Sequence, residues 1–347
     1  MRNLLYALST ILFIGCNNKV PDNKTYEVSN GVFVVCEGNF RWGNGTLSFY
    51  NSMSKTVEND VFSSANGFTL GDVPVSMQVI GNKAYMVVNN SSKIVVFDPH
   101  SFVLLKNIRG LKSPRNIVQV SSQKAYVSDL YETSIAVLDL TKDSIITRID
   151  VGKTTESFVV YQQYVFVTNW SKLAHLTVEN NTVMVIDTNN DKLIASIPVG
   201  IEPNSIVLDK NNKIWVLCGG GYLKEENPSL VKIDAKTLSK EATIVFPNKN
   251  STPTNLKINR NADSLFYLNT DVFVMSVTST TVPDKSLITG QGRLIYGLGI
   301  DEQKSEIYVS DAKDYTQPGF VYRYSFGGIA LDTFRVGINP SYFYFVY

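Results

Sequence analysis

Six aromatic side chains stand in loops between apolar segments, beside charged or amide residues. The aromatic residues are Phe40, Trp42, Tyr131, Trp170, Tyr222 and Tyr315. The polar residues that we group with them are Arg41, Asn44, Lys224 and Asp314. Flat apolar rings with polar edges suit noncovalent binding of a bulky amphipathic ligand or of a protein partner. Any one ring could instead cap the end of a strand, so the prediction of a binding face concerns the set.

The chain offers little for covalent or metal chemistry. Its only histidines are His100 and His175, which excludes a histidine-rich metal site. Nothing in the sequence places His175 beside an activated serine, as a Ser/His/Asp triad requires. Cys36 and Cys218 hold the same strand position in the first and fifth repeats, so we expect buried free thiols and no disulfide between them. We therefore predict a protein that is not an enzyme, with no catalytic residues, metal or cofactor.

Seven sequence repeats must position these loops. Each repeat is an apolar strand with a central aromatic residue, a loop, and a second apolar strand that usually ends on an acid. The seven aromatic residues, which follow one another at intervals of 40–52 residues, are Phe33, Tyr85, Tyr126, Phe166, Trp215, Phe266 and Tyr308. This spacing, with tight polar turns between strands, predicts an all-β fold: a seven-bladed β-propeller of four-stranded antiparallel blades.

The two ends of the chain are expected to complete the same blade. The first repeat starts at its second strand, residues 31–36, and residues 341–347 read as an innermost strand without a successor. Pairing these strands would close the ring and remove the exposed sheet edges of an open array. We assign the propeller to residues 28–347.

Loop lengths distinguish one face of the ring. In a propeller, the loops between the second and third strands of a blade and those between blades emerge on the same side. The long loops fall on that side, at residues 36–45, 129–133, 168–181, 218–228 and 311–319. We call this side the long-loop face and expect it to bind. Glu37, Asp129 and Asp311 could face the central channel there, or could bond the ends of strands.

Residues 1–15 have the pattern of a lipoprotein signal peptide. Arg2 precedes an apolar run, and Phe13-Ile14-Gly15-Cys16 resembles a bacterial lipobox. We expect lipidation of Cys16, with residues 16–27 as a flexible tether and several acyl chains as a stable membrane anchor. An ordinary secretory leader is the alternative.

The composition fits one large globular unit. Of 347 residues, 44% are hydrophobic and 18% are charged, which is ample material for a core. The net charge of +1 argues against nucleic acid as a partner, because binding a duplex normally requires a clustered basic face.

Three short phrases, YVSD at 126–129, IAVLD at 135–139 and PNSIV at 203–207, resemble the YncE-like seven-bladed propellers, and the likeness extends over the mature chain. Residues 31–40 (GVFVVCEGNF) and 43–50 (GNGTLSFY) are similar to a Bacteroidetes lipoprotein branch of that group. That branch includes the BtuG-type surface lipoproteins, which capture cobalamin and pass it to a TonB-dependent outer-membrane transporter. The resemblance implies a lipid-anchored outer-membrane protein, at the cell surface or on the periplasmic side.

The same resemblance implies a corrinoid as ligand rather than as cofactor, and a TonB-dependent transporter as partner. The aromatic rings of the loops would pack against the apolar edges of the corrinoid. Its peripheral amides or phosphate would bond to Arg41, Asn44, Lys224 and Asp314. Two other functions stay open. One is a protein-interaction scaffold that docks an outer-membrane partner. The other is a calcium-dependent lactonase-like hydrolase, although the sequence shows no convergent set of acidic and amide residues from several blades.

Overall fold

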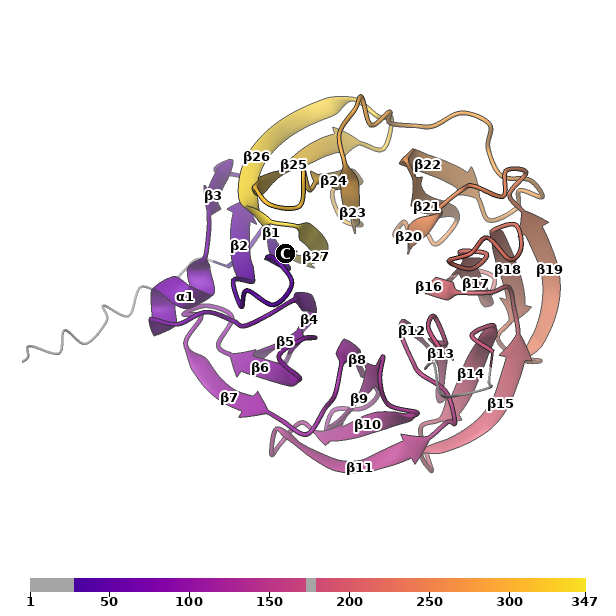
Figure 1. Ribbon diagram of the computed structural model, residues 1–347, viewed down its shortest axis with the longest axis horizontal. Coiled ribbons are helices and arrows are strands. Elements are labelled where there is room, and N and C mark those ends of the chain that lie inside the picture. Colours follow the sequence, from indigo (N-terminus) through magenta and orange to yellow (C-terminus); the bar gives the residue numbers. More distant parts are fainter. Residues whose placement is uncertain (1–27, 173–178) are drawn as a thin grey trace, which may run out of the picture.

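Seven antiparallel sheets surround one axis in the computed structural model, which describes residues 28–172 and 179–347. The chain passes once around the ring, from indigo to yellow in Figure 1. This arrangement confirms the predicted all-β, seven-bladed propeller. Residues 1–27, with the predicted leader, Cys16 and tether, lie outside the described residues, as does His175.

Blades 1 to 4 are four-stranded, and their strands are named from the innermost outward. Blade 1 contains β27 (Pro340–Val346), β1 (Gly31–Cys36), β2 (Thr46–Asn51) and β3 (Thr56–Glu58). Blade 2 contains β4 (Pro74–Ile80), β5 (Lys83–Val88), β6 (Lys93–Phe97) and β7 (Leu104–Ile108). Blade 3 contains β8 (Pro114–Gln119), β9 (Lys124–Asp129), β10 (Ser134–Asp139) and β11 (Ser144–Asp150). Blade 4 contains β12 (Phe158–Tyr161), β13 (Tyr164–Thr168), β14 (Thr182–Asp187) and β15 (Lys192–Pro198).

Blades 5 to 7 follow in the same order. Blade 5 contains β16 (Pro203–Leu208), β17 (Lys213–Cys218), β18 (Ser229–Asp234) and β19 (Ser239–Val245). Blade 6 contains β20 (Thr254–Ile258), β21 (Ser264–Asn269) and β22 (Asp271–Ser276). Blade 7 contains β23 (Ile295–Asp301), β24 (Glu306–Asp311), β25 (Pro318–Ser325) and β26 (Ala330–Ile338).

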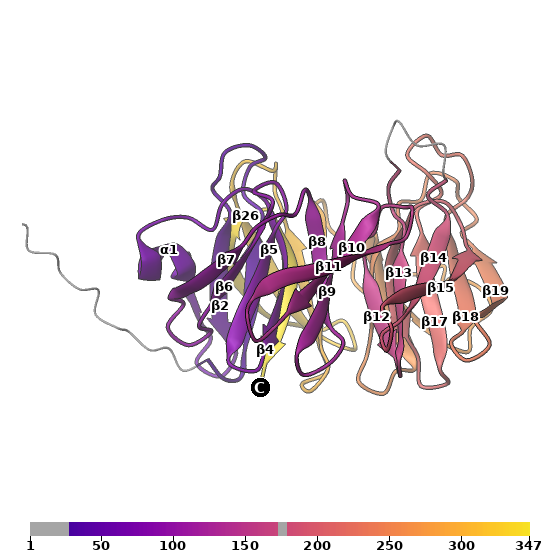
Figure 2. The same ribbon diagram turned by 90° about the horizontal axis from the view of Figure 1, so that it is seen from below.

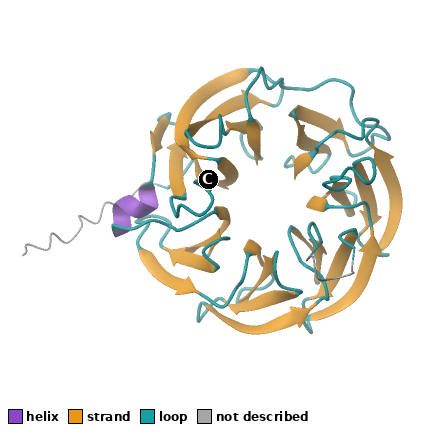
Figure 3. Ribbon diagram, viewed as in Figure 1, coloured by secondary structure: helices purple, strands orange, loops and turns teal. Residues whose placement is uncertain are grey.

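Two features depart from the regular four-stranded repeat. Blade 6 has three strands in its sheet, and residues 277–294 touch the outer strand β22 through an isolated bridge between Val272 and Ile288. This segment contains Pro283, which cannot donate a ladder hydrogen bond. A short helix, α1 (Val61–Asn66), lies at the rim between blades 1 and 2 (Figure 3).

The ring closes as the sequence predicts. The C-terminal strand β27 pairs antiparallel with β1, with Phe33 opposite Tyr344 and Val32 opposite Phe345. Blade 1 is therefore built from both ends of the propeller.

The hydrophobic core is a ring of seven layers, each between two neighbouring blades. One apolar cluster forms at every blade-to-blade interface, including the interface of blades 7 and 1. The repeat aromatics all lie in the second strand of their blades, and each is at most 2% exposed. Burial of these rings is a main favourable term in the packing of the blades.

The acids that end the repeats cap turns. The carboxylate of Asp98 accepts hydrogen bonds from the backbone N–H groups of His100 and Ser101, and Asp139 does the same for Thr141 and Lys142. A carboxylate in this place satisfies backbone donors that the end of the strand leaves free.

Two of the blade interfaces carry a polar contact of the same design. The Asp143 carboxylate of blade 3 receives hydrogen bonds from Lys83 Nζ at 2.7 Å and from the Tyr85 hydroxyl at 2.6 Å, both in blade 2. Lys124 and Tyr126 of blade 3 bind Asp191 of blade 4 in the same way. The Lys-x-Tyr pairs therefore tie successive blades together.

We expect Asp143→Ala to lower the free energy of unfolding by about 2–3 kcal/mol, because hydrogen bonds to charged groups contribute about 1.5–3 kcal/mol. Urea denaturation followed by tryptophan fluorescence measures the change. Asp284→Ala is the control, since Asp284 is exposed. Equal unfolding midpoints for the two variants would contradict the role of this contact.

The long loops emerge together on one side of the ring, the upper side in Figure 2. Residues 37–45 and 219–228 rise there, whereas the C-terminus lies on the opposite side (Figure 2). The innermost strands begin on the long-loop face, which therefore surrounds the entrance to the axis of the propeller.

Candidate functional site

A cavity of about 570 Å³ occupies the entrance to the axis on the long-loop face. Its wall comes from every blade, because each blade contributes at least one residue in, or just before, the start of its innermost strand. These residues include Val75, Arg115, Glu156, Asn204, Asn255, Tyr296 and Ser341. We call this space the central cavity.

Backbone bulges explain why residues near the start of the innermost strands line the central cavity. In six blades the register between the innermost strand and its neighbour shifts at this point, as it does between Pro114 and Ile117. In blade 4, Glu156 holds the corresponding place just before β12. A bulge leaves one residue without a partner in the ladder and re-aims its side chain, here toward the axis.

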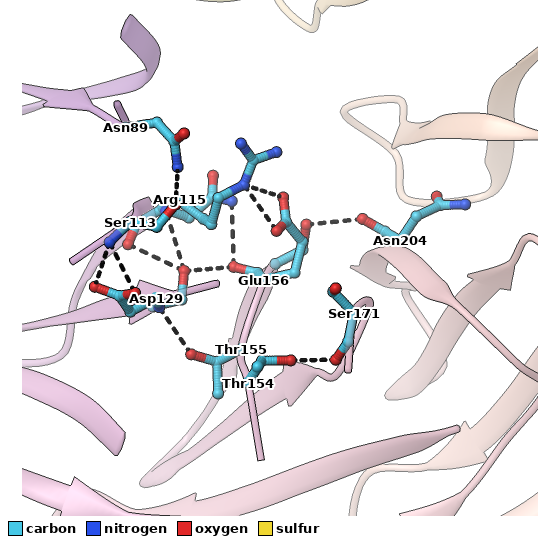
Figure 4. A network of polar contacts seen from close by, with 12 residues as sticks. Asn89, Ser113, Arg115, Asp129, Thr154, Thr155, Glu156, Ser171 and Asn204 are labelled. Carbon is cyan, nitrogen blue, oxygen red and sulfur yellow. Dashed lines mark hydrogen bonds and ion pairs between the residues drawn. The ribbon is translucent and has the colours of Figure 1, made fainter. Parts of the chain in front are cut away.

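An ion pair joins blades 3 and 4 across the cavity wall. Arg115 Nε donates to both carboxylate oxygens of Glu156, at 3.1 and 2.9 Å. In Figure 4 the two terminal nitrogens of Arg115 point away from the Glu156 carboxylate. The Trp170 ring lies beside the same guanidinium, with its centroid 5.7 Å from Arg115 Cζ.

A second carboxyl group lies on the other side of the ring. The Tyr296 hydroxyl of blade 7 donates to Glu37 Oε2 at 2.8 Å, at the end of β1 in blade 1. Burial raises the pKa of Glu37, against the opposing effects of the hydrogen bond from Tyr296 and of the charge on Arg115. Burial and the neighbouring Glu37 likewise raise the pKa of Tyr296.

Two further cations line the central cavity. Lys257 lies on β20 with its Nζ 5.6 Å from the centroid of the Tyr342 ring. Burial lowers the pKa of Lys257, since desolvation disfavours the charged ammonium. Arg293 stacks on the Tyr322 ring at 4.0 Å and donates from Nη1 to the Tyr324 hydroxyl at 3.1 Å.

Most of the aromatic residues predicted from the sequence stand on the long-loop face without lining the central cavity. Trp170 lines it. The other five rings project toward solvent: Phe40 (61% exposed), Trp42 (78%), Tyr131 (58%), Tyr222 (85%) and Tyr315 (47%).

Trp170 and Tyr222 do come together at a second, smaller cavity of about 400 Å³, which Glu202 and Glu225 also line. Tyr315 contacts the central site indirectly, because its ring meets Tyr296 edge-on at 5.7 Å. The predicted aromatic residues therefore do not form one surface. The structure distributes them over two cavities and an exposed rim.

The predicted polar residues mainly hold the loops in place. Asn44 accepts a hydrogen bond from the Asn39 backbone N–H at 2.7 Å, and Lys224 Nζ donates to the Ser251 carbonyl at 3.2 Å. Asp314 accepts from the backbone of Thr316 and Gln317, and the backbone N–H of Arg41 donates to Asp72. The Arg41 guanidinium lies over the Phe40 ring, 5.1 Å from its centroid.

The three acids considered for the channel have different roles. Glu37 lines the central cavity. Asp129 bonds the backbone N–H groups of Lys112 and Ser113, and Asp311 bonds that of Leu294, so both satisfy the backbone at strand ends.

Sequence reasoning missed Arg115, Glu156, Lys257 and Tyr296. A usable signal was present, because Pro74, Pro114, Pro203, Pro253 and Pro340 mark the entry to five innermost strands. The residues just after these prolines supply much of the cavity wall. Their types differ from blade to blade, so they form no motif by themselves.

Cys36 and Cys218 are buried free thiols, and burial raises the pKa of each to about 12. Across residues 28–172 and 179–347, no three His, Cys, Asp or Glu side chains gather where they could hold a metal ion. In the same described part of the chain, no helix has the length and apolar character to cross a membrane.

Comparisons with known proteins agree on the architecture. A family described as a domain of unknown function (DUF5074) matches residues 30–345. No curated protein sequence matches the chain.

Solved structures with the same fold include a quinonprotein alcohol dehydrogenase-like protein from Bacteroides thetaiotaomicron. It has 17% identity and a TM-score of 0.72, over 92% of this chain and 79% of that one. A functionally unknown protein from Desulfotomaculum acetoxidans has 14% identity and a TM-score of 0.67, over 90% and 97%. Hydrazine synthase from Kuenenia stuttgartiensis has 13% identity and a TM-score of 0.55, over 72% and 76%. Identities this low establish a shared fold and nothing more.

Proposed function

We propose that this chain, which belongs to the DUF5074 family, is a non-catalytic binding propeller that captures a bulky ligand on its long-loop face. The observation that carries the proposal is the central cavity, which is about 570 Å³ in volume and has Trp170 and Tyr296 in its wall. A concave site with rings and a few convergent polar groups is the usual form of a small-molecule site.

A corrinoid is the candidate ligand. One support is that residues 31–40 and 43–50 resemble a Bacteroidetes lipoprotein branch that includes the BtuG-type proteins. Another is that a large amphipathic ligand suits a site that combines a cavity with a flat aromatic rim. In this proposal, the ring system covers the mouth of the central cavity, and rim residues such as Trp42 and Tyr222 contact its edges. Lipidation of Cys16, an outer-membrane location and handover to a TonB-dependent transporter complete the proposal.

The test is calorimetry with cyanocobalamin and protein lacking residues 1–16. We expect saturable binding at one site, weakened at least about tenfold by Trp170→Ala, since central interface rings often contribute about 2 kcal/mol. The matched control is Tyr347→Ala, because Tyr347 is 49% exposed and follows β27 at the opposite face. Absence of binding at micromolar protein would reject a corrinoid as ligand.

Protein docking is the second candidate, and a different observation favours it. Phe40, Trp42 and Tyr131 do not line either cavity, although each is more than half exposed. Exposed rings of this kind are enriched where one protein binds another. If a Trp42→Ala variant binds the ligand as the wild type does but no longer binds the transporter, the exposed rim is a docking surface.

A further inference from the structure

The charges in the central cavity do not balance. Three cations line it, namely Arg115, Lys257 and Arg293, against the two carboxyl groups of Glu37 and Glu156. The protein therefore presents surplus positive charge at a site where water is partly excluded.

Lys257 is the cation that the protein itself does not neutralise. Within residues 28–172 and 179–347, its Nζ takes part in no ion pair or hydrogen bond, and its neighbour is the ring of Tyr342. Leu256, which precedes it on β20, is 2% exposed and anchors the strand in the core between blades 5 and 6. A desolvated ammonium without a counter-charge costs free energy, and an anion bound beside it would recover that cost.

Arg115 has donors to spare. Only its Nε donates to the carboxylate of Glu156. Neither terminal nitrogen of Arg115 is hydrogen-bonded to a residue in the described part of the chain. Glu156 and the neighbouring Trp170 ring fix the plane of the guanidinium. A guanidinium held in this way presents parallel N–H donors that match the oxygens of a carboxylate or phosphate.

Arg293, by contrast, is already engaged. Its guanidinium stacks on Tyr322, and its nitrogens reach the Tyr324 hydroxyl and the side chain of Gln291. It adds to the positive potential of the cavity without free donors comparable to those of Arg115.

We infer that the central cavity is an anion subsite, in which Lys257 receives a carboxylate or phosphate group of the ligand, while Arg115, on another blade of the same cavity, adds positive potential and further donors. This inference rests on the proposed binding function and adds to it the chemical class of one ligand group. The two residues come from blades 3 and 6, so the subsite exists only in the closed ring.

Calorimetry at low, constant ionic strength tests the subsite, with inorganic phosphate in one series and succinate in the other. We expect saturable binding of at least one anion, weakened on the order of tenfold or more by Lys257→Met. The preferred anion identifies the group as phosphate or carboxylate. Lys236→Met is the control, because Lys236 is an exposed lysine in the turn between β18 and β19, and it should bind as the wild type does.

Thermal unfolding without added anion separates a binding effect from a folding effect. Lys257→Met removes a desolvated charge and keeps the length of the side chain, so we expect a melting temperature equal to or above that of the wild type. Saturable binding to neither anion, or equal affinities of the wild type and a folded Lys257→Met variant, would overturn the inference.

The outcomes also separate the subsite from the proposed function. If cyanocobalamin fails to bind but phosphate binds through Lys257, the corrinoid is rejected and the subsite stands. If cyanocobalamin binds with the same affinity to Lys257→Met and neither anion binds, the binding function stands and the subsite is rejected.

Discussion

Deletion of residues 341–347 abolishes the cooperative thermal unfolding transition of the protein: this is the largest effect that we expect. The deletion removes nearly all of β27, the innermost strand of blade 1. It takes away the inner partner of every residue of β1 from Gly31 to Val35, which then pair only with β2. As a new edge strand, β1 would present a row of free backbone donors and acceptors, which is a template for aggregation.

Packing is lost as well as pairing. Phe343 is 8% exposed and packs between blades 7 and 1, whereas Tyr342 and Tyr344 pack against the cluster between blades 1 and 2. One strand therefore supports both interfaces of the closing blade. Truncation of a single buried aromatic residue costs about 3–5 kcal/mol, and the loss of several exceeds the stability of most domains.

Differential scanning calorimetry of the truncated chain, with size-exclusion chromatography to detect aggregates, measures this prediction. Deletion of Tyr347 alone is the control, because Tyr347 lies beyond β27 and is half exposed, so the transition should persist. A sharp transition in the longer truncation would show that seven blades stay closed without the strand that joins the ends.

The second large effect is expected at Arg323, which lies in blade 7 at its interface with blade 1. Its side chain is 6% exposed and donates from Nη2 to Glu306 at 2.7 Å and from Nη1 to the Tyr50 hydroxyl at 2.7 Å. Asp332 lies 3.5 Å from Nη1 and accepts a hydrogen bond from Tyr50. Because Tyr50 belongs to blade 1 and the other residues to blade 7, this network joins the last blade to the first.

We expect Arg323→Met to lower the free energy of unfolding by about 3–5 kcal/mol, because it leaves two partly buried carboxylates without their shared counter-charge. Denaturant unfolding at neutral pH measures the change. Lys210→Met is the matched control: Lys210 pairs with Asp263 at 3.3 Å, but its side chain is 52% exposed. Exposed pairs contribute at most about 1 kcal/mol.

A double variant distinguishes the charge of Arg323 from its contacts with aromatic rings. Adding Glu306→Gln to Arg323→Met removes one of the stranded charges and should restore part of the lost stability. If the two changes are instead additive, Arg323 stabilises the closure through its contacts with the rings of Tyr50 and Tyr308, whose centroids lie 5.3 and 5.5 Å from its Cζ.

The architecture could be predicted because its signals are local and repeated. A strand buried on both faces reads as an apolar run, and the run from Val32 to Cys36 is fully buried in the structure. The acid that ends the third strand in blades 2 to 5, such as Asp98, can satisfy donors only two or three residues away, so its role does not depend on distant contacts. Seven copies of one pattern also predict a ring, since each blade buries its faces only against neighbours.

Blade 6 shows where a local pattern was insufficient. Its second strand follows the repeat, with Phe266 buried between blades 6 and 7. Its outer strand is missing from the sheet, and residues 277–294 lie there instead. Whether a weakly apolar segment pairs or not depends on packing against the neighbouring blade, which no stretch of sequence displays by itself.

The sequence by itself determined the class of fold, the order of the blades, the closing strand and the side on which long loops gather. Only the tertiary structure decided which residues share a site: Glu37 and Tyr296 are 259 residues apart in the chain and 2.8 Å apart in space. The chemistry of the loops predicted the exposed rim, whereas the cavity is lined by residues near the start of the innermost strands, and the types of these residues follow no motif. The physical reason is that a bulge aims a side chain at the axis, and the axis exists only once the ring has closed.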